Sequence, residues 1–175
     1  KTACISLPRC VTPSPETLGC QRTPKWPEQL PDKLDEHVFA RLSRQAILTR
    51  PRVRFRFFVH EFALRLPVGS VEVMNGQLRQ LTRTSQQPNV AIRIVPASLG
   101  GHPASAGQFQ LMESSSYPPV VSIESEATSI YLEEASEIGA YRRVLSGLDR
   151  GALDAAQSRE LIADLMRELY PPGVQ

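Results

Sequence analysis

Four polar side chains lie at or near the ends of apolar segments, and together they would suit proton transfer: Glu61, His102, Glu124 and Tyr131. Carboxylates, an imidazole and a phenol are groups that donate and accept protons in general acid–base catalysis. The same groups would also suit a small-ligand pocket in which His102 responds to pH. The sequence therefore offers two functional interpretations of one set of residues, and it identifies no reaction.

A structural interpretation competes with both. An ionised carboxylate beside apolar strands is unfavourable unless it is paired or hydrogen-bonded. Glu61 and Glu124 are therefore expected to meet donors such as Arg65 and His102, or to face water. We favour a hydrogen-bond network that holds the loop Gly100–Gln108 against the sheet over a ligand pocket. The candidate ligand-binding residues are Trp26, Glu61, Arg65, His102, Glu124 and Tyr131.

Metal and thiol chemistry have weaker support. Glu61, His102 and Glu124 would supply two carboxylates and one imidazole, but no local ligand spacing connects them, so we predict neither a metal nor another cofactor. Three cysteines lie in the first twenty residues: Cys4, Cys10 and Cys20. They lack the paired C-x-x-C spacing of zinc sites and are odd in number, so we expect reduced thiols.

Length and charge set broad limits. The chain has 175 residues, with 20 Lys and Arg against 18 Asp and Glu. A net charge of +2 gives the whole chain no strong attraction to nucleic acid. The sequence has no apolar run long enough to span a bilayer, so we expect a cytoplasmic protein without membrane contact.

The prolines divide the chain. Residues 1–31 contain six prolines and are predicted to form an irregular arm, pinned down by Trp26, which could alternatively form a wall of the pocket. Residues 32–170 are predicted to form a single domain, and residues 171–175 a tail.

The core of that domain should be a β-α-β unit between Arg52 and Val95. Apolar residues alternate in Val53–Val59 and in Val90–Ile94, which is typical of strands. Between them, Ser70 should cap a helix that ends near Gln87. Because the carboxyl ends of parallel strands meet at one edge of a sheet, His60-Glu61 and the loop with His102 should lie at the same edge.

Other segments complete an α+β fold with a mixed sheet of about four or five strands. An N-terminal helix is expected from Asp32 to about Leu48. Residues 109–113, 120–124 and 128–132 should form an antiparallel meander. Two helices, separated by a break near Gly151 and with a capping box that begins at Asp154, should end the domain.

From Arg41 onward, an ordered series of motifs resembles one family: RLSRQAIL, VHEFALRLPVG, EVMNGQLRQL, PNVAIRIVP, GGHPASAGQFQLME, VVSIES, YLEE and YRRVLSGLDRGALD. It is the C-terminal domain of actinobacterial XRE-type (Cro-repressor-like) helix-turn-helix regulators, a domain of largely undefined function. The resemblance covers roughly residues 34–169. Glu61, His102, Glu124 and Tyr131 all lie at positions of the family pattern.

The resemblance implies a regulatory domain that senses a small-molecule ligand or a small protein partner. The family's helix-turn-helix is not found ahead of these motifs, so DNA contact is expected only through an element absent from this sequence. A homodimer is compatible with this interpretation. The alternative is a small enzyme, a cyclase or isomerase of secondary metabolism, that uses Glu61, His102, Glu124 and Tyr131 for acid–base chemistry.

Overall fold

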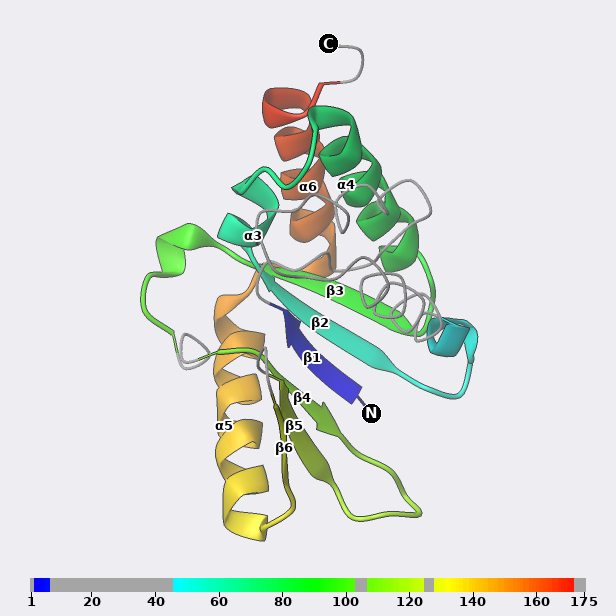
Figure 1. Cartoon of the computed structure of the whole chain (residues 1–175), viewed down its shortest axis with the longest axis vertical. Coiled ribbons are helices and arrows are strands. Elements are labelled where there is room, and N and C mark those ends of the chain that lie inside the picture. Colours follow the sequence, from blue (N-terminus) through cyan, green and yellow to red (C-terminus); the bar gives the residue numbers. More distant parts are fainter. Residues whose placement is uncertain (1, 7–45, 103–106, 125–127, 172–175) are drawn as a thin grey trace.

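The computed structural model describes residues 2–6, 46–102, 107–124 and 128–171 (Figure 1). Trp26, Cys10 and Cys20 lie outside these ranges, as does most of the helix predicted from Asp32. The described elements are β1 (Thr2–Ser6), η2 (Ala46–Thr49), β2 (Phe55–His60), α3 (Glu61–Arg65), α4 (Val71–Ser85), β3 (Val90–Val95), η3 (Ala97–Leu99), β4 (Phe109–Met112), β5 (Val120–Glu124), β6 (Ser129–Leu132), α5 (Ala135–Gly151) and α6 (Ala155–Leu169).

All six strands form one mixed sheet in the order β3-β2-β1-β4-β5-β6. β1, β2 and β3 are parallel, whereas β4, β5 and β6 follow as an antiparallel meander. The predicted α+β class is confirmed, as are the parallel β-α-β unit and the meander.

The strand β1 corrects the prediction of an irregular arm over residues 1–31. Residues 2–6 form a strand in the middle of the sheet, hydrogen-bonded to β2 on one side and to β4 on the other. The first proline of the chain is Pro8, so Thr2–Ser6 keeps all the backbone donors that a central strand needs. Cys4 therefore lies in the sheet, and the strand count rises to six.

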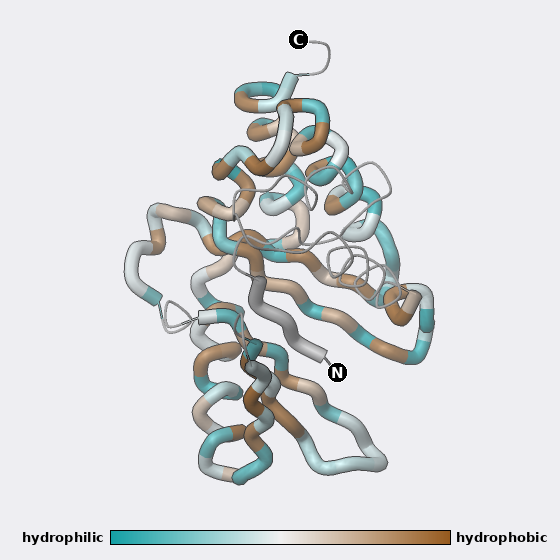
Figure 2. The backbone as a smooth tube through the Cα atoms, viewed as in Figure 1, coloured by the Kyte–Doolittle hydropathy of each residue, from teal (hydrophilic) through white to brown (hydrophobic). Residues whose placement is uncertain are grey.

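Helices cover both faces of the sheet, each over its own hydrophobic core. Phe55 and Val59 of β2 pack with residues of α4 and α6. Phe58, which points to the other face, packs with residues of α5. Hydrophobic residues recur at intervals along all three helices (Figure 2). No helix in the described ranges is both long and apolar enough to cross a membrane.

Local sequence signals account for most helix ends. The Ser70 hydroxyl accepts a hydrogen bond from the Val73 amide at 3.3 Å and begins α4. Asp154 forms the predicted capping box with Gln157 at the start of α6. The last residues of the helix predicted from Asp32 instead belong to the 3-10 helix η2. Gly151, predicted in the break between the last two helices, is the final residue of α5.

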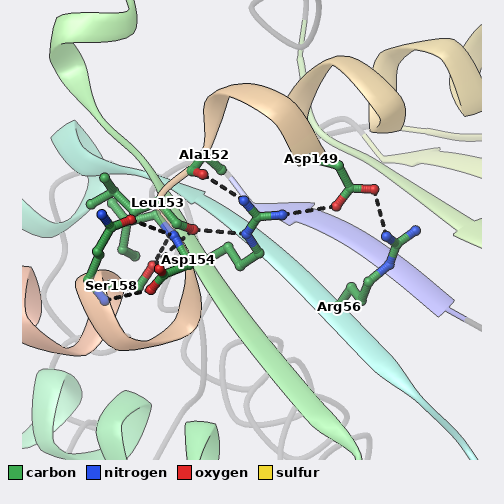
Figure 3. Close-up of polar contacts among 9 residues, drawn as sticks. Arg56, Asp149, Ala152, Leu153, Asp154 and Ser158 are labelled. Atoms are coloured by element: carbon green, nitrogen blue, oxygen red, sulfur yellow. Dashed lines mark hydrogen bonds and ion pairs between the residues drawn. The ribbon is translucent and has the colours of Figure 1, made fainter.

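The outer edge of β3 is covered by the connection between α5 and α6 (Figure 3). The Ile94 carbonyl accepts from the Leu153 amide at 2.9 Å, and the Ile94 amide donates to Ser158 Oγ at 2.9 Å. Arg93 donates to the carbonyl oxygens of Ala152 and Leu153. These bonds satisfy part of the polar backbone that an edge strand would otherwise expose.

A carboxylate on α5 completes this contact. Asp149 accepts from Arg56 at 2.7 Å and from Arg93 at 3.2 Å, and thus joins the C-terminal end of α5 to β2 and β3 (Figure 3). The helix begins directly after β6 and ends beside β3, so it spans the sheet from one end to the other.

Candidate functional site

The carboxyl ends of β2 and β3 meet at one edge of the sheet, as the sequence predicts. His60 is the last residue of β2 and lies in register with Val95, the last residue of β3. α3 starts immediately after β2, and η3 starts one residue after β3. The short helix and the loop that leads to His102 therefore begin side by side.

Glu61 connects these two segments. Its side chain is largely buried, and Oε1 accepts a hydrogen bond from Arg65 Nε at 2.6 Å. Oε2 accepts from the Ala97 amide at 2.8 Å, so the same carboxylate also holds the start of η3. Burial alone would raise the pKa of Glu61, but the Ala97 hydrogen bond, the Arg65 contact and the charge of His60 together lower it.

His60 and His102 form a pair of stacked rings beside this ion pair. The ring centroids lie 5.4 Å apart with an interplanar angle of 24°. His60 Nδ1 also accepts from the Phe62 amide at 3.2 Å and caps α3, while the Phe62 ring lies 5.1 Å from the His60 ring. Burial, and then the charge of His60, lower the pKa of His102, which favours its neutral form.

Two large apolar side chains near these rings are exposed to solvent. Phe62 is 57% exposed and Leu66 is 51% exposed. They are four residues apart, across the end of α3, a spacing that places side chains on one side of a helical turn. We refer to His60, Phe62, Leu66 and His102 as the α3 patch.

The position of α3 is fixed from behind by the end of α6. The Tyr170 hydroxyl lies 3.0 Å from the carbonyl oxygens of both Leu64 and Arg65. The Tyr170 carbonyl in turn accepts from Asn75 Nδ2 at 2.5 Å, which ties in α4. Burial raises the pKa of Tyr170, and the nearby charge of Arg65 opposes that shift only in part.

Glu124 and Tyr131 lie on the other half of the sheet. Glu124 ends β5, and β1 and β4 lie between β5 and β2. Tyr131 is in the edge strand β6, opposite Ser122, and is 63% exposed. The structure therefore brings Glu61, Arg65 and His102 to one region and keeps Glu124 and Tyr131 apart from it. Trp26 lies outside the described residues.

The sequence interpretation missed two contributors to this site. The alternation predicts His60 as the end of a strand, and the structure shows that it also caps α3. Tyr170, directly before Pro171, has no role in the sequence-based predictions. Its two partners lie more than a hundred residues earlier, and no local pattern connects them.

The chemistry of the site favours binding over proton transfer. Both Glu61 oxygens are engaged, and its lowered pKa makes it a weak base. Within the described ranges, no group of three His, Cys, Asp or Glu side chains is arranged to hold a metal ion. What the site offers to a partner is the exposed Phe62 ring and the exposed Leu66 side chain, with the half-buried rings of His60 and His102 beside Phe62.

Comparison with models of protein families matches residues 19–164 to DUF5753, a domain of unknown function. No curated protein and no solved structure matches the chain significantly.

Proposed function

Because this chain belongs to the DUF5753 family, we propose from its α3 patch that it is a sensing domain of a helix-turn-helix-type transcriptional regulator. In this proposal the α3 patch binds a protein partner or an aromatic small molecule. The regulatory role is supported by the resemblance of the ordered motifs to the C-terminal domains of such regulators. The binding role is supported by the exposed side chains of Phe62 and Leu66.

The exposed apolar surface of α3 is the observation that carries the proposal. Phe62 in α3 and Leu66 directly after it are exposed and leave hydrophobic area that a partner would bury favourably. The half-buried, stacked imidazole rings of His60 and His102 lie beside Phe62 and border this apolar surface. A carboxylate-based enzyme is supported less well, since the four candidate groups are spread over two halves of the sheet.

The hydrogen bonds of Glu61 give this surface a route to the rest of the domain. A contact that shifts α3 would also shift the Glu61 carboxylate, and with it the Ala97 amide at the start of η3. Tyr170 connects the same helix to α6 and α4. Binding at the α3 patch would thus affect the positions of α4 and α6 on one face of the sheet.

The proposal is tested by affinity purification from the native source after mild cross-linking. We expect the wild-type chain to enrich a protein that contains a helix-turn-helix or that binds promoters. The variant Phe62→Ser should lose this enrichment at least tenfold, because the substitution removes the largest exposed ring of the patch.

The matched control is Tyr117→Ser, which removes a 76% exposed ring from the turn between β4 and β5. It should retain the same partner. Equal enrichment by Phe62→Ser and wild type would refute the α3 patch as the binding surface. If the wild-type chain enriches only proteins unrelated to transcription, the regulatory assignment is refuted.

A further inference from the structure

The two edges of the sheet differ in whether other segments hydrogen-bond to their backbone. At β3, the backbone of Ile94 is bonded to Leu153 and Ser158. At β6, the last strand on the other side, the described residues supply no strand, helix or loop that bonds to the outer edge. An open edge strand presents unpaired donors and acceptors and is a template for pairing with another chain.

The composition of β6 makes it suitable for such pairing. Its four residues, Ser129–Leu132, include no charge and no proline, two of the features by which edge strands avoid association. Ile130 is 49% exposed, and Tyr131 even more so, although both are large and apolar. Alternation places Ile130 on the α5 side of the sheet and Tyr131 on the opposite side.

We propose that β6 pairs antiparallel with β6 of a second copy of this chain, which joins the two sheets into one. A two-fold axis perpendicular to the sheet keeps α5 of both copies on the same face. In an antiparallel pair, residues opposite each other point to the same face of the sheet. Because side chains alternate between faces, this requires the axis to pass through a residue and not between two residues.

An axis through Tyr131 gives the best match of side chains. It places the two Tyr131 rings opposite each other, and Ile130 opposite Leu132 of the second copy. Cross-strand aromatic and aliphatic pairs of this kind stabilise antiparallel strands. Every apolar residue of β6 would thus gain an apolar neighbour.

Charges beyond the strand support the same register. Glu133 would lie opposite Ser129 of the second copy, and Glu134 opposite Thr128, so no two carboxylates face each other. If the axis passed two residues further along, through Glu133, the Glu133 carboxylates of the two copies would face each other, which is unfavourable. In this register apolar residues of β6 face apolar residues of the second β6, and carboxylates face neutral residues. This self-complementarity favours a second copy of the chain as the partner.

The test is the oligomeric state of the full chain, measured by sedimentation velocity over a range from about 1 to 200 µM. We expect a concentration-dependent dimer. Tyr131→Lys should raise the dissociation constant at least tenfold, since it sets two ammonium groups opposite each other. Tyr117→Lys, which changes an exposed tyrosine away from β6, should leave the constant unchanged.

Disulfide trapping tests the register. Under mild oxidation, Tyr131→Cys should form a covalent dimer faster than Ser129→Cys, because only position 131 faces itself. The wild-type chain under the same conditions reports the background from its own cysteines. The proposal is overturned if the wild-type chain stays monomeric over the whole concentration range, or if Tyr131→Lys dimerises with the same dissociation constant as wild type. Faster disulfide trapping at position 129 than at position 131 also overturns it.

Discussion

At the scale of single residues, Glu61 is a largely buried charge with a structural role. It is largely buried, and each of its oxygens accepts one hydrogen bond, from Arg65 and from the Ala97 amide. A hydrogen bond to a charged group contributes more than a neutral one, and a buried partner left without it carries a desolvation penalty. Its role is to hold α3 and η3 together.

We predict that Glu61→Gln lowers the free energy of unfolding at pH 7 by about 1–3 kcal/mol. The exposed Glu160→Gln is the control and should change it by less than about 0.5 kcal/mol. Urea denaturation monitored by circular dichroism measures both variants. A loss no larger than that of the control would show that the two bonds of Glu61 add little to stability.

The lowered pKa of Glu61 also gives a pH dependence with a definite sign. Because the folded-state pKa lies below the unfolded-state value, the carboxylate stabilises the fold fully above the unfolded-state value. That contribution disappears as the pH falls through the folded-state pKa. The stability difference between wild type and Glu61→Gln should therefore shrink at acid pH, and a constant difference would contradict the assignment.

Tyr170 is the second residue with a long-range role. Tyr170→Phe keeps the buried ring but removes the hydroxyl that lies between the Leu64 and Arg65 carbonyls. We expect a loss of about 1–2 kcal/mol in the free energy of unfolding, with faster amide exchange in α3. Tyr117→Phe, at an exposed position, is the control. Unchanged exchange in α3 would show that Tyr170 does not hold this helix.

At the scale of elements, the coverage of β3 is a feature whose contribution can be measured. Ser158 is buried, and its hydroxyl accepts from the Ile94 amide. We predict that Ser158→Ala, which leaves this amide without its acceptor, costs about 1–3 kcal/mol. Chemical denaturation measures the cost, and the exposed Ser146→Ala on α5 is the matched control. Equal stability of the two variants would mean that another group satisfies Ile94.

Sequence periodicity predicted the elements whose signals are local. The alternation in β2 and β3, the Ser70 cap and the Asp154 capping box each depend on residues within a few positions of one another. β1 was missed because its five residues precede a proline-rich segment. Its pairing with Phe57 and Gln110 also depends on residues far along the chain.

In the candidate site, too, the local contacts were predictable from the sequence and the lateral order of the strands was not. Glu61 and Arg65 are four residues apart, so their pairing follows from helical spacing. The meeting of the β2 and β3 ends follows from parallel pairing. Glu124 and Tyr131 were grouped with these residues because periodicity does not give the lateral order of strands, and β1 and β4 lie between the two groups.

At the scale of the whole molecule, β1 is the strand that joins two halves. One half contains β2 and β3, and the other contains the meander, while α5 packs against strands of both halves. Among the described strands, only β1 hydrogen-bonds to both halves. The cooperativity of the fold should therefore depend on this strand of five residues as well as on α5.

We predict that Cys4→Pro weakens both halves at once. Proline removes a backbone donor in the middle of a central strand, where each donor pairs with one neighbour or the other. Hydrogen exchange should accelerate in β2 as well as in β4, and the free energy of unfolding should fall by about 1–3 kcal/mol. Cys4→Ala keeps the donor and is the control. Faster exchange in only one half would contradict a joining role.

The central place of β1 also has a consequence in time. During synthesis, residues 2–6 leave the ribosome long before their partners, because Cys4 pairs with Phe57 and Gln110. The slot between β2 and β4 is therefore complete only when most of the chain has been made, and β1 stays without its partners until then. Until β1 enters it, this slot can accept the same strand from a neighbouring nascent chain, so crowded synthesis should favour strand-exchanged products.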